Sequence, residues 1–467
     1  MKFPYLSHSA LLKRTLNFSA FWCKGINYIN KAELFKKFFY LCSNLGVICV
    51  IYISKIGVLI MIHTIEFTNY RIFSSPQKLR LAPLTVIFGK NNTGKSAILK
   101  LPLLVESALK GNSKEVFTKK INDIRICEDF RDVVFGKANK AVKVKIGNEE
   151  GDSLEFSFYV DPSNPNQQTQ IESWSITSYD GKNIIIKCDE DNILRTESNN
   201  IITFDGIIPK DAKLKEQINE ILNRFKFSVD YLGAVRELPK RDYRLHDDKK
   251  ELVGSRGEYA YDFLIEDKLN GAGKLFDTVS SWYEKIFDGW KVFIDQTHSP
   301  VYYIEMQHKN IKNNILDTGV GIVQSMPVII AATMRSNNNI NLNIFEEPET
   351  HLHPAAHADM VEYIASQIRL NNRFSLIETH SLNFILRLRL MIANGELSSE
   401  DVALYYVEFD NETGTSNLKE VFIKGDGSVS EWPKGVFNEA LEETLRLRNA
   451  QMHKNNKYEC INRERDI

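Results

Sequence analysis

The sequence has few cysteines, little net charge and no long apolar run. Its six cysteines among 467 residues include no C-x-x-C pair, which argues against a disulfide scaffold and against a structural zinc module. The formal net charge is −1, so no overall basic field indicates nucleic acid as a partner. No segment reaches the roughly 20 consecutive apolar residues that a membrane-spanning helix needs. These absences favour a globular protein of a reducing cytoplasm.

The first 60 residues differ in composition from the rest of the chain. They carry eight lysines and arginines but only one acidic residue, Glu33. Their longest apolar run, 38–53, is short for a spanning helix, so a membrane anchor stays open as the less favoured reading. Met61 begins a segment that alternates apolar and polar residues, as a half-buried strand does. We therefore expect residues 1–60 to be an extension outside the main fold, with Met61 as the true start.

The most informative segment is a glycine-rich run between a strand-like and a helix-like stretch. It matches the pattern G-x-x-x-x-G-K-[ST], and the strand before it and the helix after it are the context that the pattern requires. Its residues are Gly89, Lys90, Asn91, Asn92, Thr93, Gly94, Lys95 and Ser96. In such a loop the backbone N–H groups wrap the phosphates, Lys95 reaches the terminal phosphates and Ser96 faces Mg²⁺. The segment predicts a binding site for ATP and Mg²⁺.

A second segment ends a strand-like run in two adjacent carboxylates, Glu346 and Glu347. Most carboxylate pairs are solvated surface charges, but acids at a strand end that faces a phosphate loop have a reason to be buried. We expect Glu346 to hold Mg²⁺ through a water molecule. We expect Glu347 to orient or polarise the attacking water as the catalytic carboxylate.

Three histidines lie near or after this acidic motif. His351 and His353 could bind zinc beside a carboxylate, but no further ligand is spaced to complete a site, so we expect them to line the nucleotide interface. His380 follows the strand-like run 374–377. A lone histidine is usually structural, but the strand-end position of His380 favours a catalytic contact with the γ-phosphate.

The order of predicted elements indicates an α/β fold. Strands and helices that alternate after residue 310 predict a mostly parallel sheet with the site at the carboxyl ends of its strands. Residues 141–205 predict an antiparallel β section, and a mostly helical lobe is expected to follow to about residue 290. We expect five divisions. They are an N-terminal extension (1–60), the first half of the head with the phosphate loop (61–140), an inserted β section and helical region (141–310), the second half of the head (311–400), and terminal strands with a helix (401–467).

A basic stretch interleaved with tyrosines lies in the middle of the chain. Acidic residues dilute it, so a contact with DNA stays open as the less favoured reading. Its basic members are Arg236, Lys240, Arg241, Arg244, Lys249, Lys250 and Arg256.

Taken in order, these motifs resemble those of the compact bacterial ABC-type ATPases of the SMC/RecF-like superfamily, the AAA-type ATPases that include OLD-like and Septu-like proteins. The resemblance rests on G-x-N-x-x-G-K-S at 89–96, E-E-P-E-x-H-L-H-P at 346–354 and E-T-H-S at 378–381, and it covers about residues 61–447. It implies an ABC-type P-loop ATPase head. In such proteins ATP binds between two heads.

The resemblance also implies roles and partners. Thr318, Gly319 and Gly321 occupy the place of the ABC signature, from which one head contacts the γ-phosphate bound by the other, although they depart from L-S-G-G-Q. It implies a cytoplasmic enzyme that hydrolyses ATP to ADP and phosphate, forms a homodimer or higher oligomer, and controls a separate effector such as a nuclease in bacterial antiphage defence. A RecF-like DNA-repair ATPase and a membrane-associated transporter-type ATPase are the alternatives.

Overall fold

The computed structural model divides the chain into two compact units, Met1–Leu59 and Ile60–Ile467, and every described residue lies in the second. The structure describes residues 62–160, 168–189, 191, 193–245, 250–334, 341–371, 373–433, 436–437 and 443–448. The expected extension 1–60 and its apolar run therefore lie outside the described residues. Within the described ranges, no helix combines the length and the apolar character that crossing a bilayer requires.

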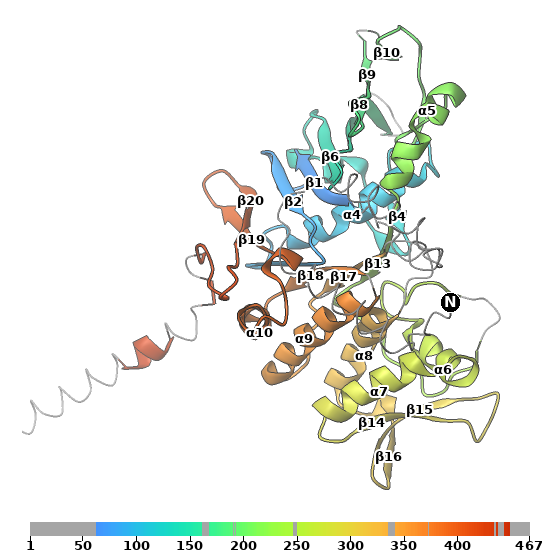
Figure 1. Cartoon of the computed structure of the whole chain (residues 1–467), viewed down its shortest axis with the longest axis vertical. Helices are drawn as coiled ribbons and strands as arrows, with labels where there is room; N and C mark the ends of the chain where they lie inside the picture. Colours follow the sequence, from blue (N-terminus) through green and yellow to red (C-terminus); the bar gives the residue numbers. More distant parts are fainter. Residues whose placement is uncertain are drawn as a thin grey trace, which may run out of the picture. The chain divides into compact units, whose positions relative to one another are not determined.

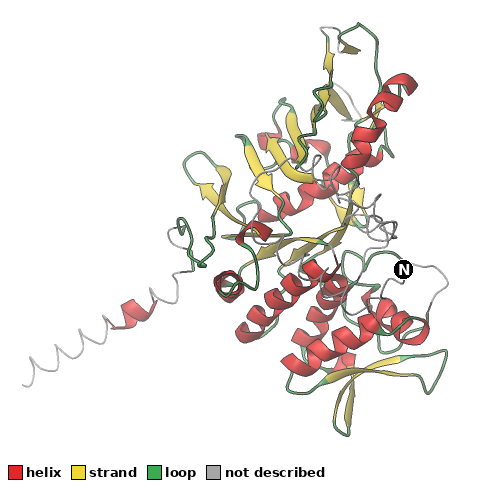
Figure 2. Cartoon of the chain, in the orientation of Figure 1, coloured by secondary structure: helices red, strands yellow, loops and turns green. Residues whose placement is uncertain are grey.

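A six-stranded sheet carries the segments of the predicted site (Figures 1 and 2). In spatial order its strands are β13 (Ser228–Leu232), β17 (Asn341–Glu346), β18 (Phe374–Thr379), β3 (Leu84–Gly89), β19 (Val402–Asp410) and β20 (Thr415–Glu420). All neighbours pair in parallel except β19 and β20. Glu346 stands opposite Glu378, and Glu378 stands opposite Ile87. The predicted mostly parallel sheet, with the site segments at one edge, is confirmed.

Helices cover both faces of this sheet and divide the core in two. On one face lies α4 (Lys95–Lys110); on the other lie α8 (Val320–Thr333), α9 (Pro354–Asn371) and α10 (Leu382–Ala393). Successive strand residues point to opposite faces. In β3, Ile87 accordingly joins the core of α4, whereas Val86 and Phe88 join the core of α8 to α10. The apolar run before Gly89 is thus buried on both sides, which fixes the position of the phosphate loop.

A seven-stranded antiparallel sheet makes up the predicted β section. Its order is β10 (Leu194–Thr196), β9 (Asn183–Cys188), β8 (Thr169–Thr177), β7 (Ser153–Val160), β6 (Val142–Asn148), β1 (Ile62–Thr68) and β2 (Gln77–Arg80). The expected division at residue 140 does not separate two sheets, since β1 and β6 are neighbours. The strands β1 and β6 pair because apolar residues stand opposite each other on them, Ile65 opposite Ile146 and Phe67 opposite Val144.

The region up to residue 290 is less helical than the sequence predicts. After α5 (Ala212–Arg224) the chain forms β13, an edge strand of the parallel sheet. The described residues from Gly233 to Tyr259 then form turns and loops before α6 (Ala260–Asn270) and α7 (Lys274–Ile286). The expected helical lobe therefore contains a strand of the head, because β13 is too short for its own pattern to distinguish a strand from a helix.

The remaining described elements are short. They are β4 (Lys120–Ile121), β5 (Ile124–Arg125), β11 (Phe204–Asp205), β12 (Ile208–Pro209), β14 (Lys291–Asp295), β15 (Tyr303–His308), β16 (Ile311–Asn314), and the 3₁₀ turns η1 (Phe130–Val133), η2 (Phe135–Lys137), η3 (Ile315–Asp317) and η4 (Ser399–Asp401). The strands β14, β15 and β16 form a three-stranded antiparallel sheet beside α7.

Candidate nucleotide-binding site

The phosphate loop, residues 89–96, connects β3 directly to α4. Gly94 precedes the helix with a φ of 98°, in the left-handed region that favours glycine. A Cβ atom on Gly94 would stand 2.6 Å from Ile72 Cγ2, and one on Gly89 would stand 2.8 Å from the carbonyl oxygen of Val407. Close packing behind the loop therefore requires glycine at both positions. The other side of the loop backbone is left to a ligand.

The loop presents backbone donors that have no partner. Among the described residues, the N–H groups of Thr93, Gly94, Lys95 and Ser96 donate no hydrogen bond. Unpaired donors at the N-terminus of a long helix attract anions, because the helix dipole adds positive potential there. The loop therefore fits a phosphate group, as its sequence pattern predicts.

Lys95 lies inside this cradle, with only 3% of its side chain exposed. Its Nζ donates a hydrogen bond to the carbonyl oxygen of Lys90 at 2.8 Å and lies 3.5 Å from Glu378 Oε1. Burial lowers the pKa of Lys95, and the charge of Glu378 opposes this effect. The ammonium group is thus held at the loop by one carbonyl and one carboxylate.

Glu378 is a site residue to which the sequence analysis gave no role. Its Oε2 accepts a hydrogen bond from Ser96 Oγ at 3.0 Å, and 6% of its side chain is exposed. Burial raises the pKa of Glu378, whereas the nearby charge of Lys95 lowers it. The sequence signal was its place in E-T-H-S, at the end of a strand that neighbours the phosphate-loop strand.

Glu346 and Glu347 diverge at the end of β17. The carboxylate of Glu346 is held from the β13 side, where Tyr231 donates its hydroxyl hydrogen to Oε1 and Ala234 donates its N–H to Oε2 at 3.2 Å. Glu347 has a φ of 43°, and its N–H donates to the carbonyl oxygen of Glu378 at 2.9 Å. The turn therefore directs the two adjacent carboxylates to different neighbours.

Glu347 and His380 face each other across the ends of β17 and β18. Glu347 Oε1 lies 3.7 Å from His380 Nε2, and about a third of each side chain is exposed. Burial, followed by the charge of Lys95, lowers the pKa of His380, which favours a neutral imidazole at pH 7. Oxygen or nitrogen atoms of Glu347, Glu378 and His380 lie within 4.8 Å of one another. This group of side chains can hold a cation or contact a phosphate.

Two buried ionic side chains fix the acidic turn. Glu349 Oε1 accepts hydrogen bonds from Thr379 Oγ1 at 2.5 Å and from the N–H of His380 at 3.0 Å. Arg236 Nη2 donates to the carbonyl oxygens of Glu346 and Glu347 at 2.8 and 3.0 Å. The guanidinium therefore holds the main chain of the turn, while Glu349 ties the turn to the end of β18.

Arg236 also reaches α8, where its Nη1 donates to the carbonyl oxygen of Gln324 at 3.2 Å. Only 4% of Arg236 is exposed, and burial lowers its pKa to about 10, which leaves it charged at pH 7. The sequence analysis counted Arg236 in the basic stretch for which a DNA contact stayed open as the less favoured reading, and its burial removes Arg236 from the exposed part of that stretch. Arg241 of the same stretch is exposed, but it pairs with Asp317 at 2.8 Å.

The signature-like residues lie at the N-terminus of α8. Gly319 is exposed with open space around it, and Thr318 Oγ1 donates to the carbonyl oxygen of Ile315. A Cβ on Gly321 would stand 2.7 Å from the carbonyl oxygen of His351 in the acidic motif. In the described ranges, no hydrogen bond or ion pair joins Thr318, Gly319 or Gly321 to the phosphate loop. The signature-like segment is therefore not part of the group that the other predicted site residues form within one copy of the chain.

The histidines of the acidic motif, His351 and His353, are both exposed. His353 Nδ1 accepts a hydrogen bond from the N–H of Ala355 at 3.3 Å. Neither histidine belongs to the described group of possible metal ligands, which consists of Glu347, Glu378 and His380.

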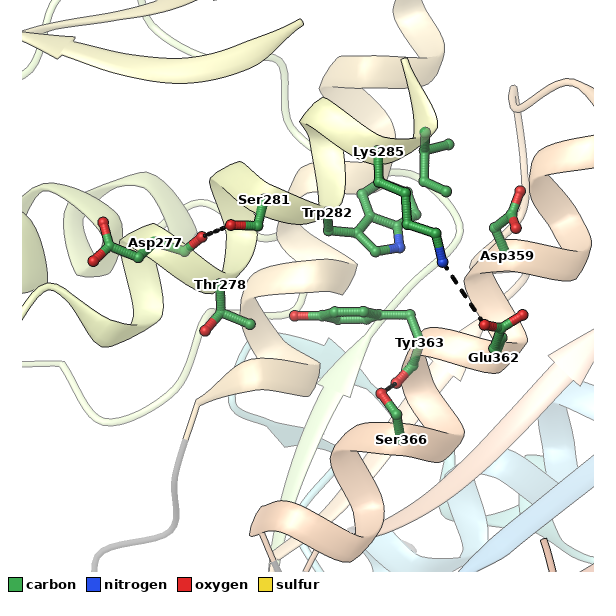
Figure 3. A pocket seen from close by; sticks show the side chains of 10 residues that line it. Asp277, Thr278, Ser281, Trp282, Lys285, Asp359, Glu362, Tyr363 and Ser366 are labelled. Atoms are coloured by element: carbon green, nitrogen blue, oxygen red, sulfur yellow. Dashed lines mark hydrogen bonds and ion pairs between the residues drawn. The ribbon is translucent and has the colours of Figure 1, made fainter. Parts of the chain in front are cut away.

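A cavity of about 500 Å³ lies between α7 and α9 (Figure 3). Figure 3 shows Trp282 of α7 and Tyr363 of α9 in its wall, and Lys285 Nζ lies 3.8 Å from Glu362 Oε1 beside them. None of the predicted site residues lines this cavity. The candidate nucleotide site is therefore the open edge of the parallel sheet and not this cavity.

Comparison with known protein families agrees with the phosphate loop. Residues 61–385, well over half of the chain, match the family described as AAA ATPase domain. The chain belongs to the AAA ATPase domain family. Membership of this family, together with the phosphate loop, identifies the chain as an ATP-binding P-loop ATPase.

Further comparisons extend beyond the AAA ATPase domain. Residues 397–447 match a family described as a protein of unknown function, DUF3696. A search of curated proteins found no match.

Three solved structures of SMC heads are similar to this AAA ATPase. One, a head bound to the C-winged helix domain of ScpA, has 12% identity and a TM-score of 0.38, over 78% of this chain and 98% of that chain. The head domain from Thermotoga maritima has 10% identity and a TM-score of 0.37, over 77% and 99%. A head with an extended coiled coil bound to the C-terminal domain of ScpA, from Pyrococcus furiosus, has 12% identity and a TM-score of 0.35, over 83% and 100%.

Proposed function

We propose that this protein hydrolyses Mg²⁺-bound ATP to ADP and phosphate between two copies of its head. The observation that carries the proposal is the meeting of three features at one sheet edge. They are the unpaired N–H groups of the phosphate loop, the buried ammonium of Lys95, and the facing pair of Glu347 and His380. Phosphoryl transfer depends mainly on positioning and on charge stabilisation, and this set of groups supplies both.

Each side chain has a defined part in this reaction. Lys95 and the loop N–H groups bind the terminal phosphates. Mg²⁺ would be held by Ser96 and, through water, by Glu346, and it would neutralise charge on the phosphates. Glu347 orients the attacking water and accepts its proton. His380, neutral at pH 7, contacts the γ-phosphate through its Nε2 side.

A second head completes the site in this proposal. Thr318, Gly319 and Gly321 lie at the N-terminus of α8, where Gly319 is exposed, Thr318 and Gly321 are partly exposed, and Val320 is 53% exposed. Apolar side chains that stay exposed next to a site are typical of an interaction surface. This arrangement supports a dimer in which the signature-like segment of each head reaches the γ-phosphate bound by the other.

The loop after β13 supports the same interface. Val235 and Leu238 are 75% and 60% exposed, although Arg236 between them is almost completely buried. Arg236 holds the acidic turn, so the loop displays its two apolar side chains from a fixed position beside Glu346 and Glu347. In a dimer, a second head would cover them.

The biological role rests on the resemblance of the motifs. By that analogy the ATP cycle of a cytoplasmic dimer controls a separate effector, such as a nuclease, in bacterial antiphage defence. A DNA-repair ATPase is the second candidate, which length-dependent stimulation of hydrolysis by DNA would favour.

The test compares ATP binding, hydrolysis and sedimentation of the wild type with two variants. Lys95→Ala should lose ATP binding, because the terminal phosphates lose their cation. Glu347→Gln should bind ATP, hydrolyse it roughly 100-fold more slowly and accumulate as an ATP-bound dimer. Lys285→Ala, at a lysine that is 71% exposed, serves as the control. Wild-type ATP affinity in Lys95→Ala would contradict the assigned cradle, and wild-type hydrolysis in Glu347→Gln would remove Glu347 from its role.

A further inference from the structure

Glu378 is a buried carboxylate at the phosphate cradle that the proposed reaction leaves without a part. Its Oε2 accepts the hydrogen bond from Ser96 Oγ at 3.0 Å, and its Oε1 lies 3.5 Å from Lys95 Nζ. Lys95 and Ser96 are the two side chains of the loop that face the phosphates and the metal. The carboxylate therefore stands where the triphosphate of ATP approaches the protein.

A negative charge at this position opposes the binding of ATP without a metal. The carboxylate is 6% exposed, so little water screens it from a phosphate. A divalent cation between the two groups changes repulsion into attraction. The unpaired N–H groups of the same loop show independently that an anionic ligand belongs here.

Glu378 is also better placed than Glu346 to meet a metal beside Ser96. Both carboxylate oxygens of Glu346 already accept hydrogen bonds from the β13 side. Glu378 shares a hydrogen bond with Ser96 itself, and an atom of its carboxylate lies within 4.8 Å of ligand atoms of Glu347 and His380. Hydroxyl and carboxylate oxygens are the ligands that Mg²⁺ prefers.

We infer that Glu378 binds the divalent cation together with Ser96 and thereby makes ATP binding depend on that cation. With the metal, Glu378 holds Mg²⁺ against the phosphates. Without it, Glu378 pairs with Lys95 and repels them. The inference rests on the proposed ATP site and adds a metal-binding carboxylate to it.

The first test measures the affinity of the full chain for a fluorescent ATP analogue, in Mg²⁺ and in EDTA. Wild-type protein should bind much more tightly in Mg²⁺. Glu378→Gln should bind more tightly than the wild type in EDTA, and its enhancement by Mg²⁺ should be smaller by about 10- to 100-fold. The matched control is Glu106→Gln, because Glu106 is also buried but pairs with Lys110 at 2.8 Å on α4. It should keep the wild-type enhancement.

The second test observes the metal directly. Mn²⁺ replaces Mg²⁺ with a non-hydrolysable ATP analogue, and electron paramagnetic resonance measures free and bound Mn²⁺. Glu378→Gln should bind Mn²⁺ about 10- to 100-fold more weakly, and Glu378→Asp, which keeps the charge, should recover part of the loss. Circular dichroism checks that the variants are folded.

The outcomes separate this inference from the proposed function. If Glu378→Gln keeps the wild-type Mg²⁺ enhancement and Mn²⁺ affinity while Lys95→Ala loses ATP binding, the role of Glu378 is refuted and the ATP site stands. If wild-type protein binds no ATP in either condition, both are refuted.

Discussion

Replacing Arg236 with lysine keeps a positive charge inside the head but removes the fork that holds the acidic turn. The guanidinium donates to the carbonyl oxygens of Glu346, Glu347 and Gln324, at 2.8, 3.0 and 3.2 Å. These carbonyls belong to two elements, the end of β17 and α8. A lysine ammonium is a single point at the end of a flexible stem, so it cannot reach both elements at once. We expect Arg236→Lys to lose two of the three hydrogen bonds.

The size of the effect follows from burial and charge. A hydrogen bond to a charged group contributes about 1.5–3 kcal/mol, so losing two of them should lower the free energy of unfolding by about 3–6 kcal/mol. Arg236→Met should lower it at least as much, because it removes all three hydrogen bonds and the cation beside Glu346, Glu347 and Glu349. In Arg236→Lys the kcat for ATP should fall more than KM rises, since Arg236 contacts the turn that carries Glu347.

Urea unfolding and steady-state ATPase assays of the full chain measure these effects. The matched control is Arg241→Lys, because Arg241 also makes two hydrogen bonds to Asp317 but is 57% exposed. Exposed ion pairs contribute about 0–1 kcal/mol, so the control should remain close to the wild type. If Arg236→Lys stays within about 0.5 kcal/mol of the wild type with unchanged kcat, the reasoning about the buried fork is wrong.

Two further predictions concern the backbone of the phosphate loop and the antiparallel sheet. Gly94→Ala places a methyl group 2.6 Å from Ile72 Cγ2, so it should lose ATP affinity and destabilise the fold by more than the roughly 1–3 kcal/mol of backbone strain. Gly136→Ala, at a φ of 61° with open space, measures the strain alone, and equal losses of unfolding free energy in the two variants would contradict the close packing. Burial opposes ionisation of Asp152, but its hydrogen bonds and Arg224 at 3.0 Å outweigh burial and hold its pKa below the usual value. The carboxylate therefore stabilises the fold above the unfolded pKa of about 3.9, and this contribution is lost as the pH falls through the folded pKa. Asp152→Asn should lower the unfolding free energy at pH 7 and matter less in acid, whereas a difference that does not change with pH would speak against the ion pair.

Local signals made half of the candidate site predictable. The residues from Gly89 to Ser96 match a pattern of fixed spacing. Its glycines indicate a backbone conformation that other residues rarely adopt, whatever surrounds the loop. The runs before Glu346 and His380 are apolar enough to indicate buried strands, and strand ends in a parallel sheet meet at one edge. For these residues, the neighbouring sequence was therefore enough to predict their place in the site.

The other half depends on partners that are distant in the sequence. Ser96 and Glu378 are 282 positions apart, and Arg236 and Glu346 are 110 positions apart. Nothing near Arg236 in the chain distinguishes it from the exposed Arg241. The strand β13 was missed for the same reason, since its five residues become a strand through pairing with β17.

The strand order of the parallel sheet also sets the timing of folding during synthesis. A growing chain emerges with its N-terminal part first, so β1, β2 and β6 to β10 are available long before β17, β18 and β19. The phosphate-loop strand β3 has only late partners, β18 and β19, and closing such long loops is slow. A ribosome-bound chain therefore exposes a phosphate loop that still lacks Glu347, Glu378 and His380. In the reaction proposed above, hydrolysis can therefore begin only when nearly the whole head has been translated.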